Sequence, residues 1–594
     1  MRTRHLVSRS MLCSRVICAA LATTPALSQA EPVVRVLEGE VPVSEARHFT
    51  LPFEVTGNIQ EIQIDHDDLS EVNILDWGLD GPEGFRGWGG GNTEPAIVGL
   101  HAASRSYLTG PLTPGTWRVV VGKAKLLEPP GRYRVEITLR DAPTLAAQPE
   151  RRPYAPSPPL STGPRWYAGD LHVHSRESGD AEPTLDAVAS FAESRGLDFV
   201  MLSDHNTTAQ LPFYADVQAR HPDLLLLPGA EVTTYAGHFN ALGATAFVEH
   251  RIGLPATSIE ATATAVHAQG ALVSINHPAL ALGDACIGCA WTHALDPAQI
   301  DAVEIGTGDV LKPGGAFSDR AVAFWESLCQ AGARPAAVGG SDDHSGGTAM
   351  GALDSPIGAP TTVIFAESLS VDALLAGVRA GNTVVKLHGP DDPMIEFWPP
   401  TVEAPGNLVA VVTGGAGYRA RWVRDGVADE AVSIEADPFT MQGTLAPTAD
   451  HPVGAERRVR LEVVQGNRRR SVTSYRWLVV PAPETAPDAA PSPDDAAEDA
   501  LPITPGEAVA DGSPVGPSDG LVGADTSSGE AGNNSPGSGG CTLTVAMHRN
   551  NLPHGLGLLA LWTIARRRRA TPCGAVARSP SYPRTHLGSS GEST

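Results

Sequence analysis

The sequence predicts an α/β region in the middle of the chain with a β region on each side of it. Between about 165 and 390, apolar strand-like runs alternate with amphipathic helical segments, which is the pattern of a parallel sheet or a barrel. The flanking segments are short, alternate in polarity and end at Gly and Pro turns, as β-strands do. Histidines and carboxylates follow most of the central strands, so the candidate functional site lies in the same region.

The length and charge of the chain limit what it can be. At 594 residues it exceeds what one hydrophobic core usually organises, so several domains are expected. The formal net charge of -24 argues against nucleic acid as a partner, because nucleic-acid binding normally needs a basic surface. Much of this charge is local, since residues 481–540 contain eleven Asp and Glu and no Lys or Arg.

Residues 1–30 predict a secretory signal peptide with cleavage after Ala30. Arginines come first, an apolar run follows, and small residues stand at Ser28 and Ala30. An uncleaved anchor is the alternative, although the apolar run is short for a spanning helix. We therefore expect an exported protein, located in the periplasm or on the cell surface or outer envelope.

The C-terminal segments are predicted to be a linker and a sorting signal. Residues 483–540 are rich in Pro, Gly, Ser and acidic residues and should be disordered. Residues 541–570 contain Cys541, a short apolar segment and the arginines 566–569, an order that resembles the MYXO-CTERM sorting signal, and a tail (571–594) follows. The resemblance implies contact with a membrane or with sorting machinery. A marginal transmembrane anchor is the alternative.

The flanking segments 31–148 and 391–482 predict two β domains. The first, with runs such as WRVVVG and YRVEITL, suggests a small β-sandwich, and the second, with YRARWVRDG and RRVRLEVVQG, looks like an immunoglobulin-like module. Residues 149–164 are rich in Pro and predict a linker. Neither β segment shows a cluster of residues able to do chemistry.

Three cysteines lie in the globular part of the chain. For Cys286 and Cys289 a local disulfide is favoured over a zinc site, because one C-x-x-C pair supplies only half of a tetrahedral structural site. Free thiols are the alternative. Cys329 lies in a helical stretch and is predicted to be a small core residue.

The central segment, 165–390, is predicted to alternate strands and helices. Its strand-like runs are LDFVML, DLLLLPGAE, ALVSINHP, DAVEIG and RPAAVGGSDDH. Helices are expected at Leu185 to Arg195 and at about 257–269, 319–332 and 370–380.

Potential metal ligands stand in the first strand and at the ends of those that follow. In the run GDLHVH, His172 and His174 point to one face of a strand, because side chains alternate along it. The carboxyl ends of such strands meet at one rim, where α/β barrels carry their sites. Imidazoles and carboxylates bind zinc and harder cations, so a cluster of them favours a metal site over polar strand ends that occur by chance. The other residues of this kind are His205, Glu231, His238, His277, Asp342 and His344.

These motifs resemble those of a known superfamily. DLHVHS, SDHN, the glutamate of GAEVTT, NHP and GSDDH occur in the order of the PHP (polymerase and histidinol phosphatase) superfamily, and GDLHVHSRESGD and GAEVTTYAGHFNALG look like its CehA/McbA branch. The resemblance covers about 225 of the 594 residues. It implies a distorted (β/α)7 barrel with two or three divalent metal ions, Zn, Mn or Fe. One departure is EIGTG at 304–308, where the branch commonly has an Asn nearby.

The resemblance also implies two metal sites that share one carboxylate. Glu231 would bridge the two ions and is a candidate catalytic residue. The other ligands would be His172, His174 and Asp342 for the first ion, and His238 and His277 for the second.

A third ion is implied as well. His205 and His344 would bind it, together with Asp180, which stands where many relatives have a histidine. Because Asp180 is the weakest of these ligands, a binuclear site is the alternative. His344 and Asp204 complete the candidate catalytic residues, and Asp204 would orient a ligand or accept a proton.

The expected function is hydrolysis of a small-molecule ester, most often a phosphate ester in the superfamily, by in-line attack of a metal-bridging hydroxide. Arg176 and Lys312, and also His250 and Arg251, are candidates to bind substrate oxygens, although each also reads as a solvated surface charge. The same ligands would serve a carboxylic or carbamate ester hydrolase. A non-catalytic surface binding or adhesion protein is the alternative of another class, and it would predict lost ligands.

Overall fold

The computed structural model describes residues 31–283, 286–307, 316–348, 355–402 and 404–483. The predictions made for the signal peptide, for the linker beyond residue 483, for the sorting segment and for Lys312 lie outside these residues. In the described parts of the chain, no helix is long and apolar enough to cross a membrane.

The N-terminal region consists of two antiparallel sheets of four strands each. Along β2, Leu51, Phe53 and Val55 are buried and alternate with exposed residues, as the alternating sequence predicts. They share one core with Trp77 and Trp117. The strand orders are β1 (Val33–Glu40), β8 (Arg132–Arg140), β3 (Glu61–Asp67), β6 (Ala96–Gly99), and β2 (His48–Val55), β7 (Gly115–Lys125), β4 (Ile74–Gly81), β5 (Gly84–Gly90).

The central strands belong to two sheets. One contains β11 (Leu225–Leu227), β10 (Phe199–Leu202), β9 (Ser161–Val173), β17 (Thr361–Leu369) and β18 (Thr383–Lys386). The other contains β12 (Gly229–Thr234), β13 (Gly237–Leu242), β14 (Leu272–Ile275), β15 (Ala302–Gly306) and β16 (Ala336–Gly339). Isolated backbone bridges, Val173 with Asp343 and His205 with Glu231, link the two sheets at the carboxyl ends of β9 and β10.

The pairing of the central strands is mixed rather than all parallel. Strands β9, β10 and β11 pair in parallel, as do β14, β15 and β16, but β13 is antiparallel to both of its neighbours, and β17 is antiparallel to β9 and β18. The run DLLLLPGAE is two strands, because Pro228 separates β11 from β12. Strand β9 begins at Ser161, inside the segment expected to be a linker, because Ser161 and Thr162 pair with β17.

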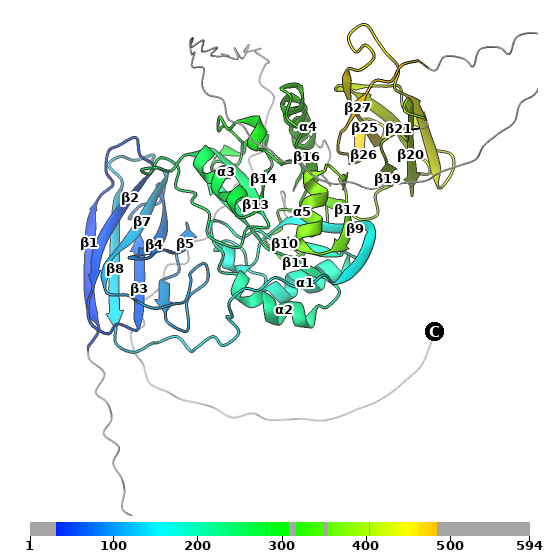
Figure 1. Cartoon of the computed structure of the whole chain (residues 1–594). Helices are drawn as coiled ribbons and strands as arrows, with labels where there is room; N and C mark the ends of the chain where they lie inside the picture. The colour runs from blue at the N-terminus through cyan, green and yellow to red at the C-terminus, as the bar shows by residue number, and fades with distance from the viewer. Residues whose placement is uncertain (1–30, 284–285, 308–315, 349–354, 403, 484–594) are drawn as a thin grey trace, which may run out of the picture. The chain divides into compact units, whose positions relative to one another are not determined.

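The helices form where the apolar spacing predicts them. In α1 (Leu185–Ser194), Leu185, Val188 and Ala192 are buried, and Thr184 caps the first turn by accepting a hydrogen bond from Ala187 N. Ser258 and Ser370 cap α3 (Ile259–Ala268) and α5 (Val371–Arg379) in the same way. Helix α4 is Ala316–Gln330. The sequence did not predict α2 (Tyr214–Arg220), which is only two turns long and lies beside α1 in Figure 1.

The C-terminal region continues a central sheet. Strand β26 (Arg468–Thr473) pairs with β18 and then with β25 (Glu456–Gln465), which pairs with β21 (Arg419–Arg424) and β27 (Arg476–Val479). Two short strands, β22 (Val427–Ala428) and β23 (Val432–Ser433), pair with β21, and a separate sheet holds β19 (Met394–Phe397), β20 (Asn407–Thr413) and β24 (Phe439–Thr444). Val363 and Val384 of the central strands share a core with Trp422.

The mixed α/β class is therefore confirmed. Closure of the central sheets into a (β/α)7 barrel and the immunoglobulin-like character of the C-terminal region stay predictions.

Candidate metal centre

The end of strand β9 brings the two histidines of GDLHVH together, His172 within the strand and His174 directly after it. His172 and His174 are fully buried and lie side by side, with ring centroids 5.2 Å apart. Leu171 and Val173 point into two apolar cores instead. The alternation predicted from the sequence is confirmed, since the two histidines leave the strand on one face.

The remaining candidate ligands arrive from other strand ends and from one hairpin. His205 follows β10, His277 follows β14, and Asp342 and His344 follow β16. Glu231 lies inside β12 rather than at its end, and the β12–β13 hairpin places His238 opposite Thr233. The structure brings all nine predicted ligands together, including Asp180, which follows the short 3-10 helix η1 (Arg176–Ser178).

Glu231 is the centre of the cluster, and its two oxygens face different histidines. Oε2 lies 2.8 Å from His205 Nδ1 and 3.4 and 3.5 Å from the Nε2 atoms of His172 and His174. Oε1 lies 3.2 Å from His238 Nδ1 and 3.3 Å from His277 Nε2. One carboxylate thus contacts two groups of imidazoles, as a bridging ligand would.

Asp342 completes the first group. Its Oδ1 lies 3.1 Å from Nε2 of both His172 and His174. The ligand atoms of His172, His174, Glu231 and Asp342 all lie within 4.8 Å of one another, which is compact enough for them to coordinate a single ion.

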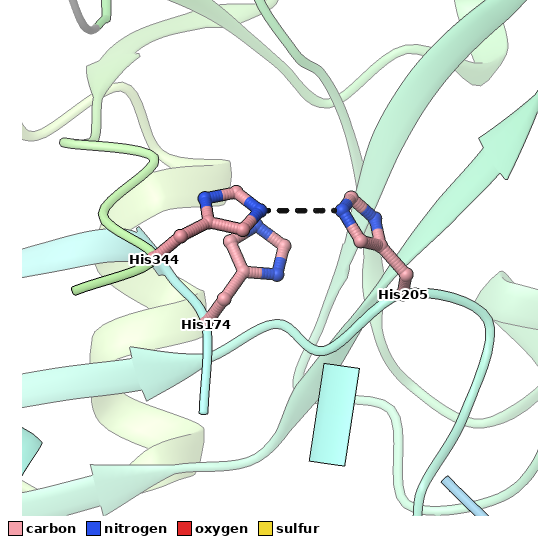
Figure 2. A group of neighbouring side chains, drawn as sticks. All are labelled: His174, His205 and His344. Atoms are coloured by element: carbon pink, nitrogen blue, oxygen red, sulfur yellow. Dashed lines mark hydrogen bonds between the residues drawn. The ribbon is translucent and has the colours of Figure 1, made fainter. Parts of the chain in front are cut away.

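A third group contains three histidines from separate parts of the chain. Figure 2 shows the imidazoles of His174, His205 and His344 converging, with Nε2 of His205 and Nε2 of His344 3.4 Å apart. Asp180 Oδ2 lies 3.3 Å from His205 Nε2 and 3.6 Å from His344 Nε2. The Asp180 side chain is 57% exposed, so this group faces the open side of the cluster.

Most of these imidazoles make a hydrogen bond at Nδ1 that leaves Nε2 directed into the cluster. His172 Nδ1 contacts Glu304 Oε1 at 3.2 Å, and His174 Nδ1 contacts Ser178 Oγ at 2.9 Å. The Nδ1 atom of His277 bonds to the backbone carbonyl of Cys289, and that of His344 bonds to the backbone carbonyl of Asp342. Partners of this kind fix the tautomer and orientation of histidines that bind metals.

Several buried polar atoms in the cluster make no hydrogen bond of good geometry within the described residues, although charged groups lie close to some of them. They are His172 Nε2, Glu231 Oε2 and both ring nitrogens of His238. Buried polar atoms left unpaired are costly, and a divalent cation would satisfy these at once. The donor set of imidazoles and carboxylates is the one that zinc, manganese and iron accept, so these residues fit two or three such ions.

The charges of the cluster are strongly coupled. Burial acts to raise the pKa of Glu231, but His172, His205 and His238 outweigh it and hold that pKa well below its usual range. Burial acts to lower the pKa of His172, and Asp342 outweighs it and holds the pKa well above its usual range. The effect is not uniform, because burial lowers the pKa of His174 to about 3 and also lowers the pKa of His238.

The backbone is strained at two of the candidate ligands. His277 has φ 27° and Asp342 has φ 56°, both in the left-handed region that side chains rarely adopt. Such strain persists only where the surroundings hold the residue in place, and it concentrates at functional sites. It aims two side chains that follow strands β14 and β16.

Three carboxylates around the cluster position other groups. Glu304, which the sequence did not single out although it begins the run EIGTG, contacts His172 and accepts a hydrogen bond from His277 N at 2.8 Å. Asp170 accepts from the backbone N of His172, at 3.0 Å, and from two further backbone N–H groups. Asp204 accepts from N and Oγ of Ser175, at 2.6 and 2.8 Å, and burial raises its pKa to about 8.

Asp204 is thus placed to hold the loop after β9. It is not among the residues that line the cavity of the site, so its predicted role as a proton acceptor stays a prediction.

The basic residues proposed for substrate binding are distributed differently. Arg176 is exposed and does not line the cavity. Arg251 is held by Glu249 and by Asp80, at 2.5 and 2.7 Å, so its charge is already paired. His250 does line the cavity.

The cavity in front of the cluster has a volume of about 570 Å³. One wall is formed by the candidate metal ligands, and another by Leu280, Leu282 and Ile287 with the disulfide Cys286–Cys289, which the sequence analysis had favoured. Cys329 is free and buried, as predicted.

A further wall comes from the N-terminal region, where the sequence had shown no chemically able cluster. His48, Asp76 and Trp88, from β2, β4 and β5, line the cavity. They are far apart in the sequence, so no local pattern unites them. The one local signal is the glycine run 89–91 beside Trp88, because glycines at a strand mark close approach of another backbone. A Cβ on Gly179 would indeed lie 3.1 Å from Gly89 O.

Buried polar contacts join the N-terminal region to the loop after β9, which carries candidate ligands. Ser106 of the N-terminal region donates from N and Oγ to Oε2 and the backbone carbonyl of Glu177, at 3.1 and 2.7 Å. Arg151 pairs with the same Glu177 at 3.6 Å, and both side chains are 3% exposed. Glu177 lies in η1, between His174 and Asp180, so the N-terminal region supports the loop that carries two candidate ligands.

Comparison with known proteins gives structural neighbours only. No family model and no curated protein matches the chain. A two-domain protein of Bacteroides vulgatus that contains a predicted PHP-like metal-dependent phosphoesterase is 17% identical, with a TM-score of 0.29, over 56% of this chain and 100% of its own. A protein of Bifidobacterium adolescentis described as a metal-dependent phosphoesterase is 16% identical, with a TM-score of 0.23, over 32% of this chain and 91% of its own.

An amidohydrolase of Chromobacterium violaceum, with sulfate and no metal bound, is 17% identical, with a TM-score of 0.22, over 32% of this chain and 93% of its own. TM-scores below 0.5 are too low to assign a shared fold, so the case for function rests on the residues of this chain.

Proposed function

We propose that this chain is a metal-dependent hydrolase of a small-molecule ester, with a phosphate ester as the first candidate. The observation that carries the proposal is Glu231, whose two oxygens face two separate groups of imidazoles at 2.8 to 3.5 Å. Nothing structural is gained by burying one carboxylate among so many histidines, and such an arrangement serves an ion cluster.

The residues that would hold the ions are those of the three groups. Bound divalent ions lower the pKa of water toward neutrality and stabilise negative charge on the attacking and leaving oxygens of a displacement. The chain itself orients the imidazoles through Glu304, Ser178 and two backbone carbonyls. Asp180 and His344, on the open side, are placed to meet an incoming ester.

A second candidate is hydrolysis of a carboxylic or carbamate ester. The described residues that line the cavity include no lysine or arginine, so apart from bound ions little in this part of the site would attract a highly charged phosphate. This favours an ester of low charge, either a phosphodiester or an uncharged ester.

We also propose the finer features that the motifs suggest. The central sheets would close into a PHP-type (β/α)7 barrel, and the chain would be exported and held at the cell envelope by residues 541–570. Cell fractionation of the native chain and of a chain stopped at Gly540 tests the location. Retention of the shortened chain in the envelope would overturn the C-terminal attachment.

Elemental analysis of the purified chain tests the metal centre. We expect at least two equivalents of Zn, Mn or Fe, and Glu231→Gln should lose more than one equivalent because both groups share that carboxylate. Glu193→Gln is the matched control, since Glu193 also contacts a histidine, His221 at 2.8 Å, but lies outside the site. Loss of one equivalent or less in Glu231→Gln would show that Glu231 does not bridge.

Activity is then measured on phosphodiester, phosphomonoester and carboxyl ester substrates. Hydrolysis of at least one class that requires the bound metal is expected. A metal-loaded protein that hydrolyses none of them would favour the non-catalytic binding protein instead.

A further inference from the structure

The wall that the N-terminal region adds to the cavity is built of aromatic rings. His48 stacks on Tyr235, with centroids 5.5 Å apart and planes 20° apart, and Trp88 meets His250 edge to face at 4.5 Å. His48 and His250 approach each other at 6.4 Å, so the four rings form one continuous group. We call this group, His48, Trp88, Tyr235 and His250, the ring wall. All four residues line the same cavity as the candidate metal ligands.

His250 has unused hydrogen-bonding capacity. Its side chain is buried, with the residue 2% exposed, and neither ring nitrogen has a hydrogen-bond partner among the described residues. Burial and then Arg251 hold the pKa of His250 well below its usual range, so the ring is neutral and offers one donor and one acceptor. A buried polar ring that faces a cavity and bonds to nothing is placed to bond to a ligand.

The ring wall is held firmly against the central region. Tyr235 lies between β12 and β13, and its hydroxyl donates to Asp76 Oδ2 at 2.7 Å. Gly122 of β7 makes room for it, because a Cβ there would lie 2.1 Å from Tyr235 Oη. The wall is therefore preorganised rather than assembled by the ligand.

The charges around the ring wall disfavour an ion as the ligand. Burial and then Arg251 lower the pKa of His48 to about 4, and Lys123 acts in the same direction. Burial is the main reason why His48 stays neutral, and a charged ligand would have to leave water at the same buried place. An anion would meet the carboxylate of Asp76 and no described lysine or arginine in the cavity lining.

We propose that the ring wall is the specificity subsite of the metal centre, and that it takes an uncharged planar ring with a hydrogen-bonding atom on its edge. The ring would stack on Trp88 and bond to His250, and it would belong to the organic part of the ester. The assignment to an ester rests on the proposed function. The binding of the ring does not.

Direct binding to the full chain tests the subsite. The probes are indole and indene, which have nearly the same shape but differ in the N–H donor, and indole-3-acetate as the charged analogue. Indole should bind five- to tenfold more tightly than indene, about the value of one hydrogen bond, and more tightly than indole-3-acetate. Equal affinities for indole and indene would overturn the hydrogen bond to His250.

Variants assign the effect to residues. His250→Phe should keep indene binding and reduce the preference for indole to about one, and Trp88→Leu should weaken both ligands about tenfold. His66→Phe is the control, because His66 is another histidine of the N-terminal region with a pKa lowered to about 4, and it stacks on Trp77 outside the cavity. If His250→Phe does not fold, His250→Leu replaces it. An unchanged preference for indole in a folded variant would overturn the proposal.

The outcomes separate the subsite from the proposed function, because ring binding needs no metal and no turnover. Selective indole binding with no hydrolysis of any ester would keep the subsite and refute the hydrolase. Metal-dependent hydrolysis that indole does not inhibit would keep the hydrolase and refute the subsite.

Discussion

The two β regions that flank the centre of the chain are joined to it in different ways. The C-terminal region continues a central sheet through β18 and β26, and none of its described residues lines the cavity. The N-terminal region shares no strand pairing with the centre within the described residues, yet several of its side chains, among them His48, Asp76 and Trp88, line that cavity. The C-terminal region, which is joined to the centre by strand pairing, thus supports the central sheet. The N-terminal region, which is joined to it by side-chain contacts, contributes residues to the site.

The supporting role of the C-terminal region depends on one buried ionic group. Arg460 lies 2.8 Å from Glu462, with the side chains 3% and 0% exposed, and also contacts Glu326 of α4. Arg460→Met removes the buried cation that both carboxylates share, while Glu462 keeps Arg421 and Arg469 as partners, so the change should cost about 2–3 kcal/mol of unfolding free energy. Denaturant unfolding measures it, and metal content of the folded protein should be unchanged.

Arg457→Met is the matched control for this effect. Arg457 pairs with Asp425 at 2.8 Å with more exposure, 13% and 21%, so its loss should cost about 1 kcal/mol or less. Equal losses in the two variants would show that burial of the Arg460 group does not matter.

Removing the metal ions should destabilise the strands that lie next to the N-terminal region, β12 and β13, more than the strands of the C-terminal region. Chelation should lower the melting temperature, since ligand at a hundred times its Kd contributes about 2.7 kcal/mol. Backbone hydrogen exchange should become faster in β12 and β13, which carry Glu231 and His238 and lie on either side of Tyr235 in the sequence. It should not change in β25 and β26. An unchanged melting temperature, or uniform quickening, would contradict the comparison.

Adding one methyl group to a glycine should weaken ligand binding when the glycine lies in the N-terminal region but not when it lies in the C-terminal region. Gly122→Ala displaces Tyr235 and should weaken indole binding about tenfold, or 1.4 kcal/mol, with a smaller effect on stability. Gly406→Ala in the C-terminal region is the control, because its Cβ would meet Pro481 Cγ at 3.4 Å, an ordinary contact. Isothermal titration compares the two variants, and equal weakening would remove the distinction.

The regions should also differ in their response to pH. Burial raises the pKa of Asp76 to about 6 from 3.8, so its stabilising protonated form is complete below pH 3.8 and is lost as the pH rises through 6. Burial opposes ionisation of Glu462, but Arg460 outweighs it and lowers the pKa to about 2, so Glu462 does not titrate between pH 5 and 8.

In metal-free protein, the unfolding free energy relative to Asp76→Asn should therefore fall by about 1 kcal/mol between pH 4 and 7, a value reduced because Asp76 is partly exposed. Relative to Glu462→Gln it should stay constant between pH 5 and 8. A rise toward pH 7 in the first comparison would contradict the assigned shift.

The sequence predicted which candidate ligands lie together, because their positions follow local rules. Alternation along β9 places His172 and His174 together, and the ends of neighbouring strands deliver His205 and His277. The ring wall could not be predicted in this way, because His48 and Trp88 are brought to the cavity by packing between regions.

Local sequence patterns also failed to predict whether neighbouring strands pair in parallel or antiparallel. Glu231 was expected at a strand end, and it lies inside a hairpin strand whose turn is not marked by an Asn-Gly or Asp-Gly pair. The periodicity of β12 and β13 cannot show whether a short buried run pairs in parallel or antiparallel.

The contact between Arg151 and Glu177 limits how this protein can be recombined. Arg151 lies in the segment expected to be a linker, but it is 3% exposed and pairs with a residue beside the candidate ligands. An exchange of the N-terminal region for an unrelated β domain would remove Ser106, which donates to Glu177, and the carbonyls of Ala103 and Tyr107 that hold Arg151 in place. The Glu177 carboxylate would then be buried with fewer partners, at a cost of about 1–3 kcal/mol. The two regions must therefore be exchanged or retained together if the loop that carries His174 and Asp180 is to keep its support.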